Sequence, residues 1–199
     1  MDTHKYYIVT ATAPVNIAVI KYWGKRDEHL ILPLNDSISF TLSQSQLCAT
    51  TTACISPAFT HDAFWLNGKE ESFQNPRIQN CLKEIRCRGK KRSTDGASGG
   101  DDRTSWRVHI CSCNNFPSAA GLASSAAGYA AMVVAVAEVY GVSAMDLSIA
   151  ARQGSGSACR SVLGGLVRWI KGEKPDGSDS FARQLVPPDY WGDLHDTAL

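Results

Sequence analysis

The sequence predicts an α+β fold in which a mixed sheet packs against helices. Segments rich in β-branched and aromatic residues come first along the chain, and segments with helical character follow later. Strands and helices do not alternate regularly and no internal repeat is present, which argues against a βαβ arrangement. The chain has 199 residues, of which 44% are hydrophobic, so it is long enough for one globular domain with a sizeable core.

Alternating apolar residues and turn signals place the expected strands. The dipeptide Asn67-Gly68 follows an apolar run and is the strongest short signal for a β-hairpin. Trp106, Val108 and Ile110 alternate with polar neighbours, as in a half-buried strand. We therefore expect strands or strand-like apolar segments at residues 6–13, 17–22, 30–34, 37–42, 48–55, 64–66, 106–110 and 166–170.

The helical segments lie mainly in the second half. Residues 119–140 are apolar nearly all round, which predicts a long central helix that ends at Gly141. Ser143 with Asp146 resembles a capping box that begins a second helix. The expected helices are therefore residues 76–88, residues 119–140, a helix that ends near residue 153, and a short helix within residues 155–163.

Residues 89–105 are polar, charged and rich in glycine, which predicts a flexible loop. Glycines and acids directly follow a small basic cluster, so we interpret that cluster as a solvated surface rather than a nucleic-acid interface. The net charge of +1 agrees, because a general nucleic-acid binder needs a concentrated basic surface. The cluster consists of Arg86, Arg88, Lys90, Lys91 and Arg92.

The seven cysteines are irregularly spaced and form no CxxC pair, which argues against a zinc site or a disulfide framework. Free thiols are typical of a reducing compartment. The N-terminus lacks a long apolar signal region, and the longest apolar run, residues 126–137, is shorter than the roughly 20 residues that span a bilayer. We therefore expect a cytosolic protein that binds neither membrane nor nucleic acid.

The first motif with chemical meaning is NNFPSAAGLASSAAG, residues 114–128. Small residues let a backbone approach a ligand closely, and the following helix start presents unpaired N–H groups to an anion. Ser124 and Ser125 add hydroxyls for phosphate or for the shell of a magnesium ion. A tight helix start with serine caps is the simpler alternative. No Gly-Lys-Ser/Thr follows, so this is not a Walker P-loop.

The exact string resembles the second motif, Pro-x-x-x-Gly-Leu-x-Ser-Ser-Ala, of the small-molecule (GHMP) kinase superfamily. The resemblance implies that ATP, with Mg²⁺, is held at this loop, without a direct protein ligand for the metal. It also implies the superfamily's N-terminal domain, which is similar to domain 2 of ribosomal protein S5. By this resemblance the ATP-binding residues are Pro117, Gly121, Leu122, Ala123, Ser124, Ser125 and Ala126.

A second motif, PVNIAVIKYWGKRD, covers residues 14–27. Lys21 and Lys25 lie four residues apart beside two aromatic residues and a glycine. Two cations suit a polyanionic substrate by Coulomb attraction. The alternative is a strand end that carries solvated lysines.

A third motif, GSGSACRS, covers residues 154–161. Alternating glycine and serine can form an anion-binding nest of backbone N–H groups, and Arg160 can bind a phosphate through two hydrogen bonds. A flexible linker is the alternative, but the segment runs straight into an apolar strand, which argues against it.

Together the three strings resemble the mevalonate diphosphate decarboxylase family, from about Thr10 to about Trp191. The resemblance implies ATP-dependent decarboxylation of 5-diphosphomevalonate to isopentenyl diphosphate, in the isoprenoid and sterol pathway, by an enzyme that forms homodimers. It implies that Lys21 adjoins the reacting centre as the catalytic residue. The substrate-binding residues that it implies are Asn16, Tyr22, Trp23, Gly24, Lys25, Arg77, Ser155, Gly156, Ser157, Ala158, Cys159 and Arg160.

The sequence departs from the family pattern in two places. Asp36 stands where the family usually has serine, and its charge weakens polyanion binding unless it points away from the site. The family's catalytic aspartate lies in a C-terminal half that this sequence does not contain. We therefore expect residues 1–191 to be the N-terminal ATP- and substrate-binding domain and residues 192–199 to be a divergent tail, with the C-terminal domain absent.

Two hypotheses from different classes remain, with a weaker third. The chain represents a decarboxylase, or it is a truncated isoform or incomplete gene product that only binds ligands. A different kinase of the superfamily is the third, and the GSGSACR string argues against it.

Overall fold

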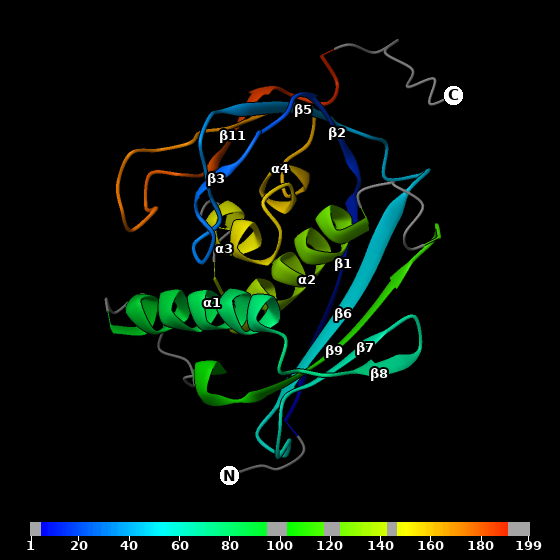
Figure 1. The fold of residues 1–199 in the computed structure, drawn as a ribbon. Helices are drawn as coiled ribbons and strands as arrows, with labels where there is room; N and C mark the ends of the chain where they lie inside the picture. The colour runs from blue at the N-terminus through cyan, green and yellow to red at the C-terminus, as the bar shows by residue number, and fades with distance from the viewer. Residues whose placement is uncertain (1–4, 95–102, 118–123, 143–146, 191–199) are drawn as a thin grey trace.

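A computed structural model describes residues 5–94, 103–117, 124–142 and 147–190. The helices lie between two sheets, and the buried helix α2 (Ser124–Tyr140) crosses the middle of the molecule (Figure 1). Strands dominate the first half of the chain and helices are concentrated later, which confirms the α+β prediction with its mixed sheet.

The larger sheet has five strands in the order β1-β6-β9-β7-β8. Strand β7 runs parallel to β9 and the other neighbours are antiparallel, so the sheet is mixed. Side chains on β6 alternate between a buried and a half-buried face, as expected for a sheet covered on one side. Its strands are β1 (Tyr7–Pro14), β6 (Cys48–Ser56), β7 (Ala63–Leu66), β8 (Lys69–Glu71) and β9 (Arg107–Asn114).

The predicted hairpin joins β7 to β8. Asn67 and Gly68 both have positive φ angles, 52° and 79°. A type I′ turn requires positive φ at both central residues, and asparagine and glycine tolerate it best. The hairpin prediction is therefore confirmed.

The smaller sheet has four antiparallel strands in the order β11-β10-β5-β2. Strand β11 was not predicted, because only its first residue is buried and no alternating apolar pattern marks it. Its strands are β2 (Asn16–Ile20), β5 (Ser37–Thr41), β10 (Leu166–Trp169) and β11 (Ala182–Val186), and β3 (Lys25–Asp27) pairs separately with β4 (Leu32–Pro33).

Four α-helices fill the space between the sheets. Helix α2 packs on β1 and β6 with one side and on α4 with another, while α3 packs against α1. Gly141 follows α2 with φ 72°, so the predicted C-terminal cap is confirmed. Ser143 and Asp146 lie outside the described residues. The helices are α1 (Pro76–Thr94), α2 (Ser124–Tyr140), α3 (Leu147–Gly154) and α4 (Ala158–Ser161), with a 3₁₀ turn η1 (Arg103–Ser105).

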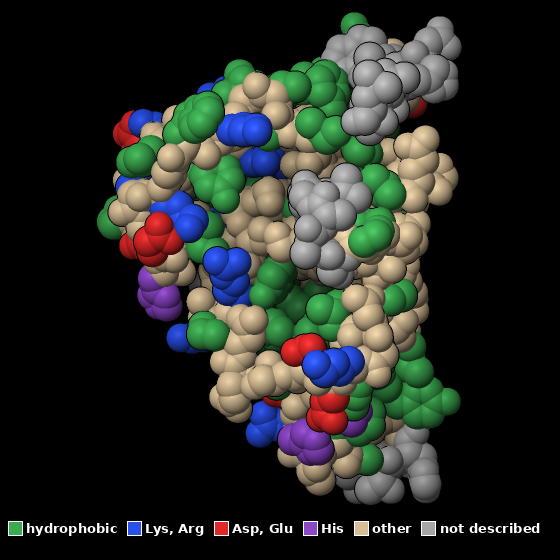
Figure 2. Space-filling model, turned by 45° about the vertical axis from the view of Figure 1, so that its right-hand side comes forward, with side chains coloured by type: hydrophobic (Ala, Val, Ile, Leu, Met, Phe, Trp, Pro, Cys, Tyr) green, Lys and Arg blue, Asp and Glu red, His purple; other side chains and the backbone are tan. Residues whose placement is uncertain are grey.

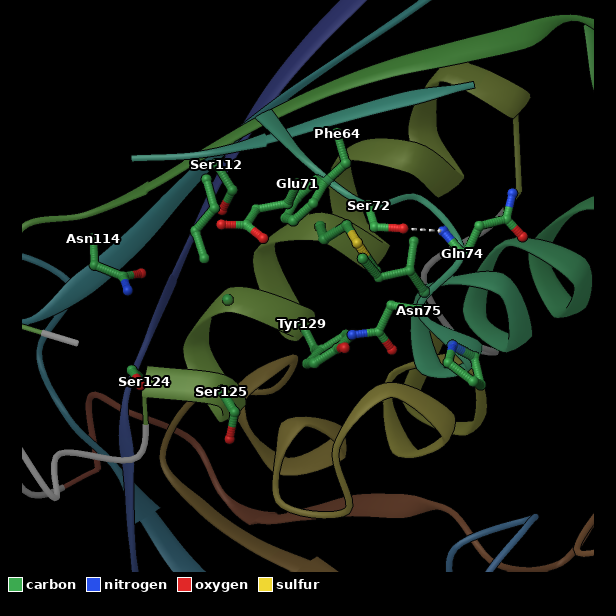
Figure 3. A pocket seen from close by; sticks show the side chains of 15 residues that line it. Phe64, Glu71, Ser72, Gln74, Asn75, Ser112, Asn114, Ser124, Ser125 and Tyr129 are labelled. Carbon is green, nitrogen blue, oxygen red and sulfur yellow. Dashed lines mark hydrogen bonds between the residues drawn. The ribbon is translucent and has the colours of Figure 1, made fainter. Parts of the chain in front are cut away.

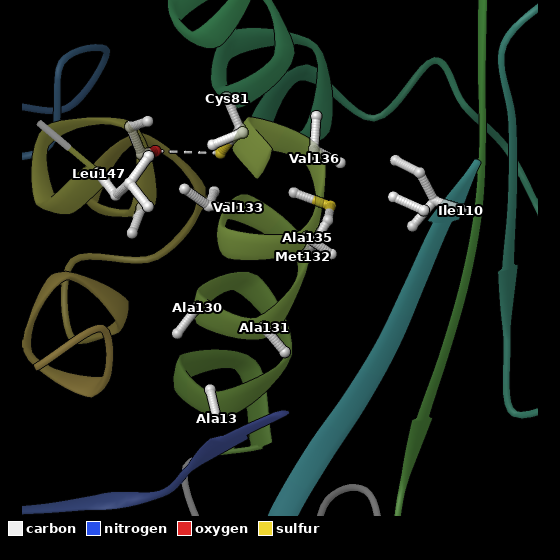
Figure 4. Packing of buried hydrophobic residues seen from close by; sticks show 14 of the residues in the cluster. Ala13, Cys81, Ile110, Ala130, Ala131, Met132, Val133, Ala135, Val136 and Leu147 are labelled. Carbon is white, nitrogen blue, oxygen red and sulfur yellow. Dashed lines mark hydrogen bonds between the residues drawn. The ribbon is translucent and has the colours of Figure 1, made fainter. Parts of the chain in front are cut away.

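Helix α2 is the centre of the main hydrophobic core. Its alanines let neighbouring elements approach closely, and Figure 4 shows Leu147 on one side of the helix and Ile110 on the other. Both side chains are buried, so α2 is covered on both sides, as its uniform apolar sequence predicts. No helix in the described ranges is both long and apolar enough to cross a lipid bilayer.

The structure corrects the start of the predicted loop at residues 89–105. Helix α1 continues through Gly89 to Thr94, and a 3₁₀ turn occupies Arg103–Ser105. Lysine and arginine favour helix continuation, and Gly89 packs so closely that a β-carbon there would lie 2.6 Å from Thr104 Cγ2. Here glycine permits packing rather than ending the helix. Residues 95–102 lie outside the described part.

The basic cluster at the end of α1 is not wholly a solvated surface. Arg86 Nη2 lies 2.9 Å from Asp62 Oδ1 and also donates to the Tyr140 hydroxyl. Arg88 Nε lies 2.7 Å from Glu84 Oε1, one helical turn away. Arg86 therefore holds α1 to the neighbouring elements. The prediction was wrong for it because local sequence does not reveal a partner 24 residues away.

Candidate functional site

The third motif forms the turn between α3 and α4 together with α4 itself, and Asn16 at the start of β2 holds it. The Asn16 amide donates to the Ser157 carbonyl at 3.0 Å and to Ser161 Oγ at 2.7 Å. Its carbonyl oxygen accepts a hydrogen bond from Arg160 Nη2 at 3.3 Å. Two predicted substrate-binding segments, far apart in sequence, are thus joined through a buried asparagine.

Arg160 is only 2% exposed, although it was predicted to bind phosphate. Its Nε donates to Ser39 Oγ at 2.9 Å and its Nη1 to Ser37 Oγ at 2.6 Å. Burial lowers the pKa of this guanidinium, yet arginine remains charged at neutral pH. These hydrogen-bond acceptors and Asn16 Oδ1 are neutral oxygens, so the guanidinium is held without a hydrogen-bonded carboxylate. Ser37 and Ser39 were not among the predicted site residues. Their signal in the sequence was a pair of polar residues on one face of an expected strand.

A row of hydroxyls connects the first motif with the third. Ser125 Oγ lies 3.5 Å from Ser155 Oγ, which lies 3.3 Å from Ser157 Oγ. Ser125 belongs to the first turn of α2, where backbone N–H groups lack helical partners. The row therefore joins the predicted nucleotide loop to the predicted substrate loop.

The second motif runs from the end of β1 through β2 to β3, and it is partly exposed. Tyr22 packs edge-on against Trp169, whereas Trp23 is 83% exposed and only its backbone N–H is engaged, by Asn35 Oδ1 at 3.1 Å. Gly24 packs closely, since a β-carbon there would lie 2.9 Å from Leu34 Cδ1. The exposed Lys21 accepts a hydrogen bond from Asn35 at its carbonyl.

A cavity of about 260 Å³ brings Lys25 and Arg77 together. Lys25 comes from β3 and Arg77 from the first turn of α1. Lys25 Nζ pairs with Glu28 Oε2 at 2.7 Å, so an anionic ligand would compete with this carboxylate for the ammonium group. Lys25 of the second motif and Arg77, which lies outside the three motifs, therefore share one recess.

A large cavity, with a volume of about 730 Å³, lies beside the N-terminal half of α2. Phe64, Leu66 and Met132 give it an apolar wall. Figure 3 shows Asn114, Ser124 and Ser125 grouped on one side of it and Asn75 on another. Figure 2 shows a hollow with a mostly hydrophobic floor on this side of the molecule. An apolar pocket with a few polar groups is typical of a small-molecule site.

The structure describes four of the seven predicted ATP-binding residues. Ser124 and Ser125 line the large cavity and Pro117 is exposed, whereas Ala126 is fully buried in the core. The side chain of Ala126 therefore cannot meet a ligand. The remaining three, Gly121, Leu122 and Ala123, lie outside the described residues.

Two predicted substrate-binding residues also have inaccessible side chains. Ala158 and Cys159 are fully buried, and the Cys159 thiol donates to the Gly156 carbonyl at 3.0 Å. Burial raises the pKa of Cys159 to about 12, so the thiol stays protonated. Only the backbone of these residues can contribute to binding.

Asp36 points toward Arg168 of β10 and forms an ion pair with it. Its other oxygen accepts a hydrogen bond from the Lys171 N–H at 2.7 Å. Burial alone would raise the pKa of Asp36, but the Lys171 N–H and Arg168 lower it. Because Arg168 and the Lys171 N–H balance the charge of Asp36, we expect this residue to have little effect on an anion at the site.

The described residues include no group of three or more His, Cys, Asp or Glu side chains placed to hold a metal ion. Magnesium that arrives with a nucleotide fits this donor set, because Mg²⁺ keeps several waters and uses few protein oxygens. The Ser124 and Ser125 hydroxyls are neutral oxygens at the cavity beside the helix start.

A mixed sheet, a buried central helix with hydroxyls at its start and an adjoining cavity define an N-terminal domain of the GHMP kinase fold. Residues 13–182 match the model of the diphosphomevalonate decarboxylase-like N-terminal domain. The chain therefore belongs to the diphosphomevalonate decarboxylase family, which confirms the resemblance found in the sequence.

Individual relatives agree. The chain is 59% identical to the diphosphomevalonate decarboxylase of Bos taurus over 188 residues, which cover 94% of this chain and 47% of the relative. The Trypanosoma brucei mevalonate diphosphate decarboxylase structure matches with a TM-score of 0.82 and 45% identity, over 93% of this chain and 47% of that one. A further structure, MDDEF in complex with MVAPP, AMPPCP and magnesium, has a TM-score of 0.74 and 37% identity, over 93% and 52%. The chain thus spans about half the length of these relatives.

Proposed function

We propose that this chain provides the nucleotide- and substrate-binding part of an ATP-dependent diphosphomevalonate decarboxylase. The reaction transfers the γ-phosphoryl group of ATP to the tertiary hydroxyl of (R)-5-diphosphomevalonate. Phosphate and carbon dioxide then leave, so that isopentenyl diphosphate and ADP are the other products. The observation that carries the proposal is the hydroxyl row Ser125–Ser155–Ser157, which joins a nucleotide-sized cavity to a cationic substrate loop.

Positive charge supports binding of the diphosphomevalonate anion. Lys25 and Arg77 share the smaller cavity. Lys21 lies in the segment that leads from β2 to Lys25 at the start of β3. Arg160 adds a buried positive charge behind the Ser155–Ser157 turn. Since this charge is far from bulk water, its attraction for a phosphate is less screened than that of a surface lysine.

The large cavity supports binding of the nucleotide. Its apolar wall suits a flat base, and the hydroxyls of Ser124 and Ser125 lie beside the helix start where phosphate groups bind well. When bound, ATP with Mg²⁺ supplies the phosphoryl group and neutralises charge on it. The chain's own part is to hold both substrates in line, and phosphoryl transfer depends mainly on such positioning.

Ligand binding without turnover is a second candidate. The carboxylates described near the second motif are already engaged: Glu28 with Lys25, Asp27 with the Leu30 N–H and Asp36 with Arg168. None of these three is placed as an unengaged general base. This observation favours a chain that binds both substrates but needs a further carboxylate to act on them.

Calorimetry and a product assay on the purified chain test the proposal together. We expect 5-diphosphomevalonate and Mg-ATP each to bind, and no isopentenyl diphosphate or carbon dioxide to form. Turnover at an ordinary enzymatic rate of roughly 1–10³ per second would favour the complete decarboxylase over binding alone. Failure of both ligands to bind would reject the proposed function. A stable phosphorylated product without carbon dioxide would indicate a kinase.

Two further parts of the proposal concern the setting of the protein. A homodimer accords with the family resemblance. A cytosolic location accords with the seven cysteines, which are free in the structure. Light scattering on the purified chain tests the homodimer. Fractionation of cells that express the chain tests the location.

A further inference from the structure

Trp169, the last residue of β10, belongs to none of the three motifs, yet it lies where two of them meet. Its side chain is 0% exposed. Its Nε1 donates to Ser180 Oγ at 3.1 Å, and the Ser180 hydroxyl donates in turn to the Ile170 carbonyl at 2.9 Å. The indole ring is therefore held at its polar edge by a short hydrogen-bonded chain.

The indole touches both substrate motifs. The Tyr22 ring lies edge-on to it, with ring centroids 4.9 Å apart and an interplanar angle of 69°. The Arg160 guanidinium carbon lies 5.9 Å from its ring centroid. At this distance the negative face of the indole attracts a cation, more strongly when the pair is shielded from water.

The far edge of the indole also supports the glycine-serine turn. A β-carbon built on Gly156 would lie 2.8 Å from Trp169 Cη2 and 3.1 Å from Cζ3. The backbone of Gly156 therefore rests directly on the ring, and only glycine fits there without movement of the indole. A shorter ring at position 169 would leave this turn unsupported.

We propose that Trp169 is a positioning residue of the diphosphomevalonate site, which sets Tyr22, Gly156 and Arg160 at fixed distances from one another. This inference rests on the proposed function. The residue acts through the side chains and backbone that it supports and makes no contact with the substrate itself. Ser180 takes part by fixing the rotation of the indole about its side-chain bonds.

Phenylalanine at position 169 separates this role from simple core packing. Trp169→Phe keeps an aromatic ring but loses both the Nε1 bond and the edge beneath Gly156. We expect the affinity for 5-diphosphomevalonate to fall about tenfold, a shift that calorimetry resolves easily. We expect the affinity for the ATP analogue AMPPCP to stay within about twofold, because the nucleotide cavity is lined by other elements.

Tyr140→Phe is the matched control. Tyr140 is also a buried aromatic residue with a hydrogen-bonded polar atom, but it contacts Arg86 and Trp106 on another side of the molecule. We expect it to lower thermal stability without a change in either affinity. Ser180→Ala keeps the whole indole and removes only its anchor, so we expect a smaller loss, about threefold, for diphosphomevalonate alone.

A double-mutant cycle gives the sharpest result. Gly156→Ala alone should weaken diphosphomevalonate binding, because its β-carbon meets the indole. In Trp169→Phe the ring is shorter, so adding Gly156→Ala should reduce the affinity for diphosphomevalonate by a clearly smaller factor than it does in the wild type. Additive losses would overturn the proposal.

The remaining outcomes are also decisive. A folded Trp169→Phe that binds diphosphomevalonate as the wild type does, or that loses both ligands equally, would overturn the positioning role and leave the proposed function standing. If Trp169→Phe does not fold, the selective loss in Ser180→Ala decides, and its absence overturns the proposal. A wild-type chain that does not bind diphosphomevalonate overturns this inference, and it rejects the proposed function as well if Mg-ATP also fails to bind.

Discussion

At the scale of single residues, Arg160 is a buried cation whose hydrogen-bond partners carry no charge. Arg160 is held by Ser37, Ser39 and Asn16, all of which are neutral. Hydrogen bonds to neutral oxygens satisfy the N–H groups but do not cancel the charge. The site therefore keeps a net attraction for an anion, which a structural arginine–carboxylate pair would have lost.

Arg160→Ala tests the importance of this charge. We expect the affinity for 5-diphosphomevalonate to fall about 10- to 100-fold, since hydrogen bonds to charged groups contribute about 1.5–3 kcal/mol. Arg86→Ala is the control, because Arg86 is half-buried and ion-paired with Asp62 away from the site. Both variants should lose stability, and calorimetry should show weaker binding only for the first. Equal affinities in the two folded variants would remove Arg160 from the site.

At the scale of elements, helix α2 belongs to the hydrophobic core and also borders the large cavity. Its middle and end are buried among β1, β6, α1 and α3, while its first turns border the large cavity. Gly128 lies at this boundary: it lines the cavity, and a β-carbon there would meet nothing within 4 Å. Glycine inside a helix lowers its stability by roughly 1 kcal/mol relative to alanine. We infer that the space it leaves serves the ligand.

Gly128→Leu should therefore separate stability from binding. The leucine side chain enters the cavity, so we expect Mg-ATP affinity to fall at least about tenfold. Thermal stability should rise, because leucine favours a helix by several tenths of a kcal/mol or more over glycine. Gly128→Ala is the matched control and should raise stability with little change in affinity. Unchanged nucleotide affinity in Gly128→Leu would place the nucleotide elsewhere.

At the scale of the whole molecule, Asp62 connects elements that the chain brings together from distant positions. It pairs with Arg86 of α1 and Arg107 of β9, and it accepts the Val108 N–H at 2.8 Å. Burial alone would raise the pKa of Asp62, but hydrogen bonds from Arg86 and Val108 hold it below its ordinary value. The carboxylate is therefore more stable in the folded chain than in the unfolded one.

This pKa shift predicts an acid-sensitive contribution to stability. A lowered carboxyl pKa stabilises the fold fully above the unfolded value, about 3.9, and the contribution disappears as pH falls through the folded pKa. At pH 7 we expect Asp62→Asn to lower the free energy of unfolding by about 1–3 kcal/mol. The difference from wild type should shrink below about pH 4.

Urea unfolding between pH 3 and 7 measures this difference. Glu70→Gln, a change at an exposed carboxyl on β8, is the control and should leave the pH dependence unaltered. A pH-independent difference between wild type and Asp62→Asn would show that the charge of Asp62 does not carry the effect.

Local sequence signals predicted much of the fold. The hairpin at Asn67-Gly68, the buried helix α2 and its glycine end at Gly141 follow from backbone preferences and periodicity, which act over a few residues. Strand β11 and the last turns of α1 could not be predicted from such signals. Strand β11 depends on pairing with β10, and the end of α1 depends on packing against Thr104. Such contacts produce no periodic hydrophobic pattern in the sequence of the segment itself.

The sequence by itself determined the family of this chain and located the three motifs, because each motif needs its residue types at a short, fixed spacing. Only the tertiary structure decided what those motifs rest on. Ser37 and Ser39 lie more than 100 residues from Arg160, the indole beneath Gly156 comes from β10, and several elements line the cavity beside α2. Long-range packing places these groups, and it cannot be read from any one stretch of the chain.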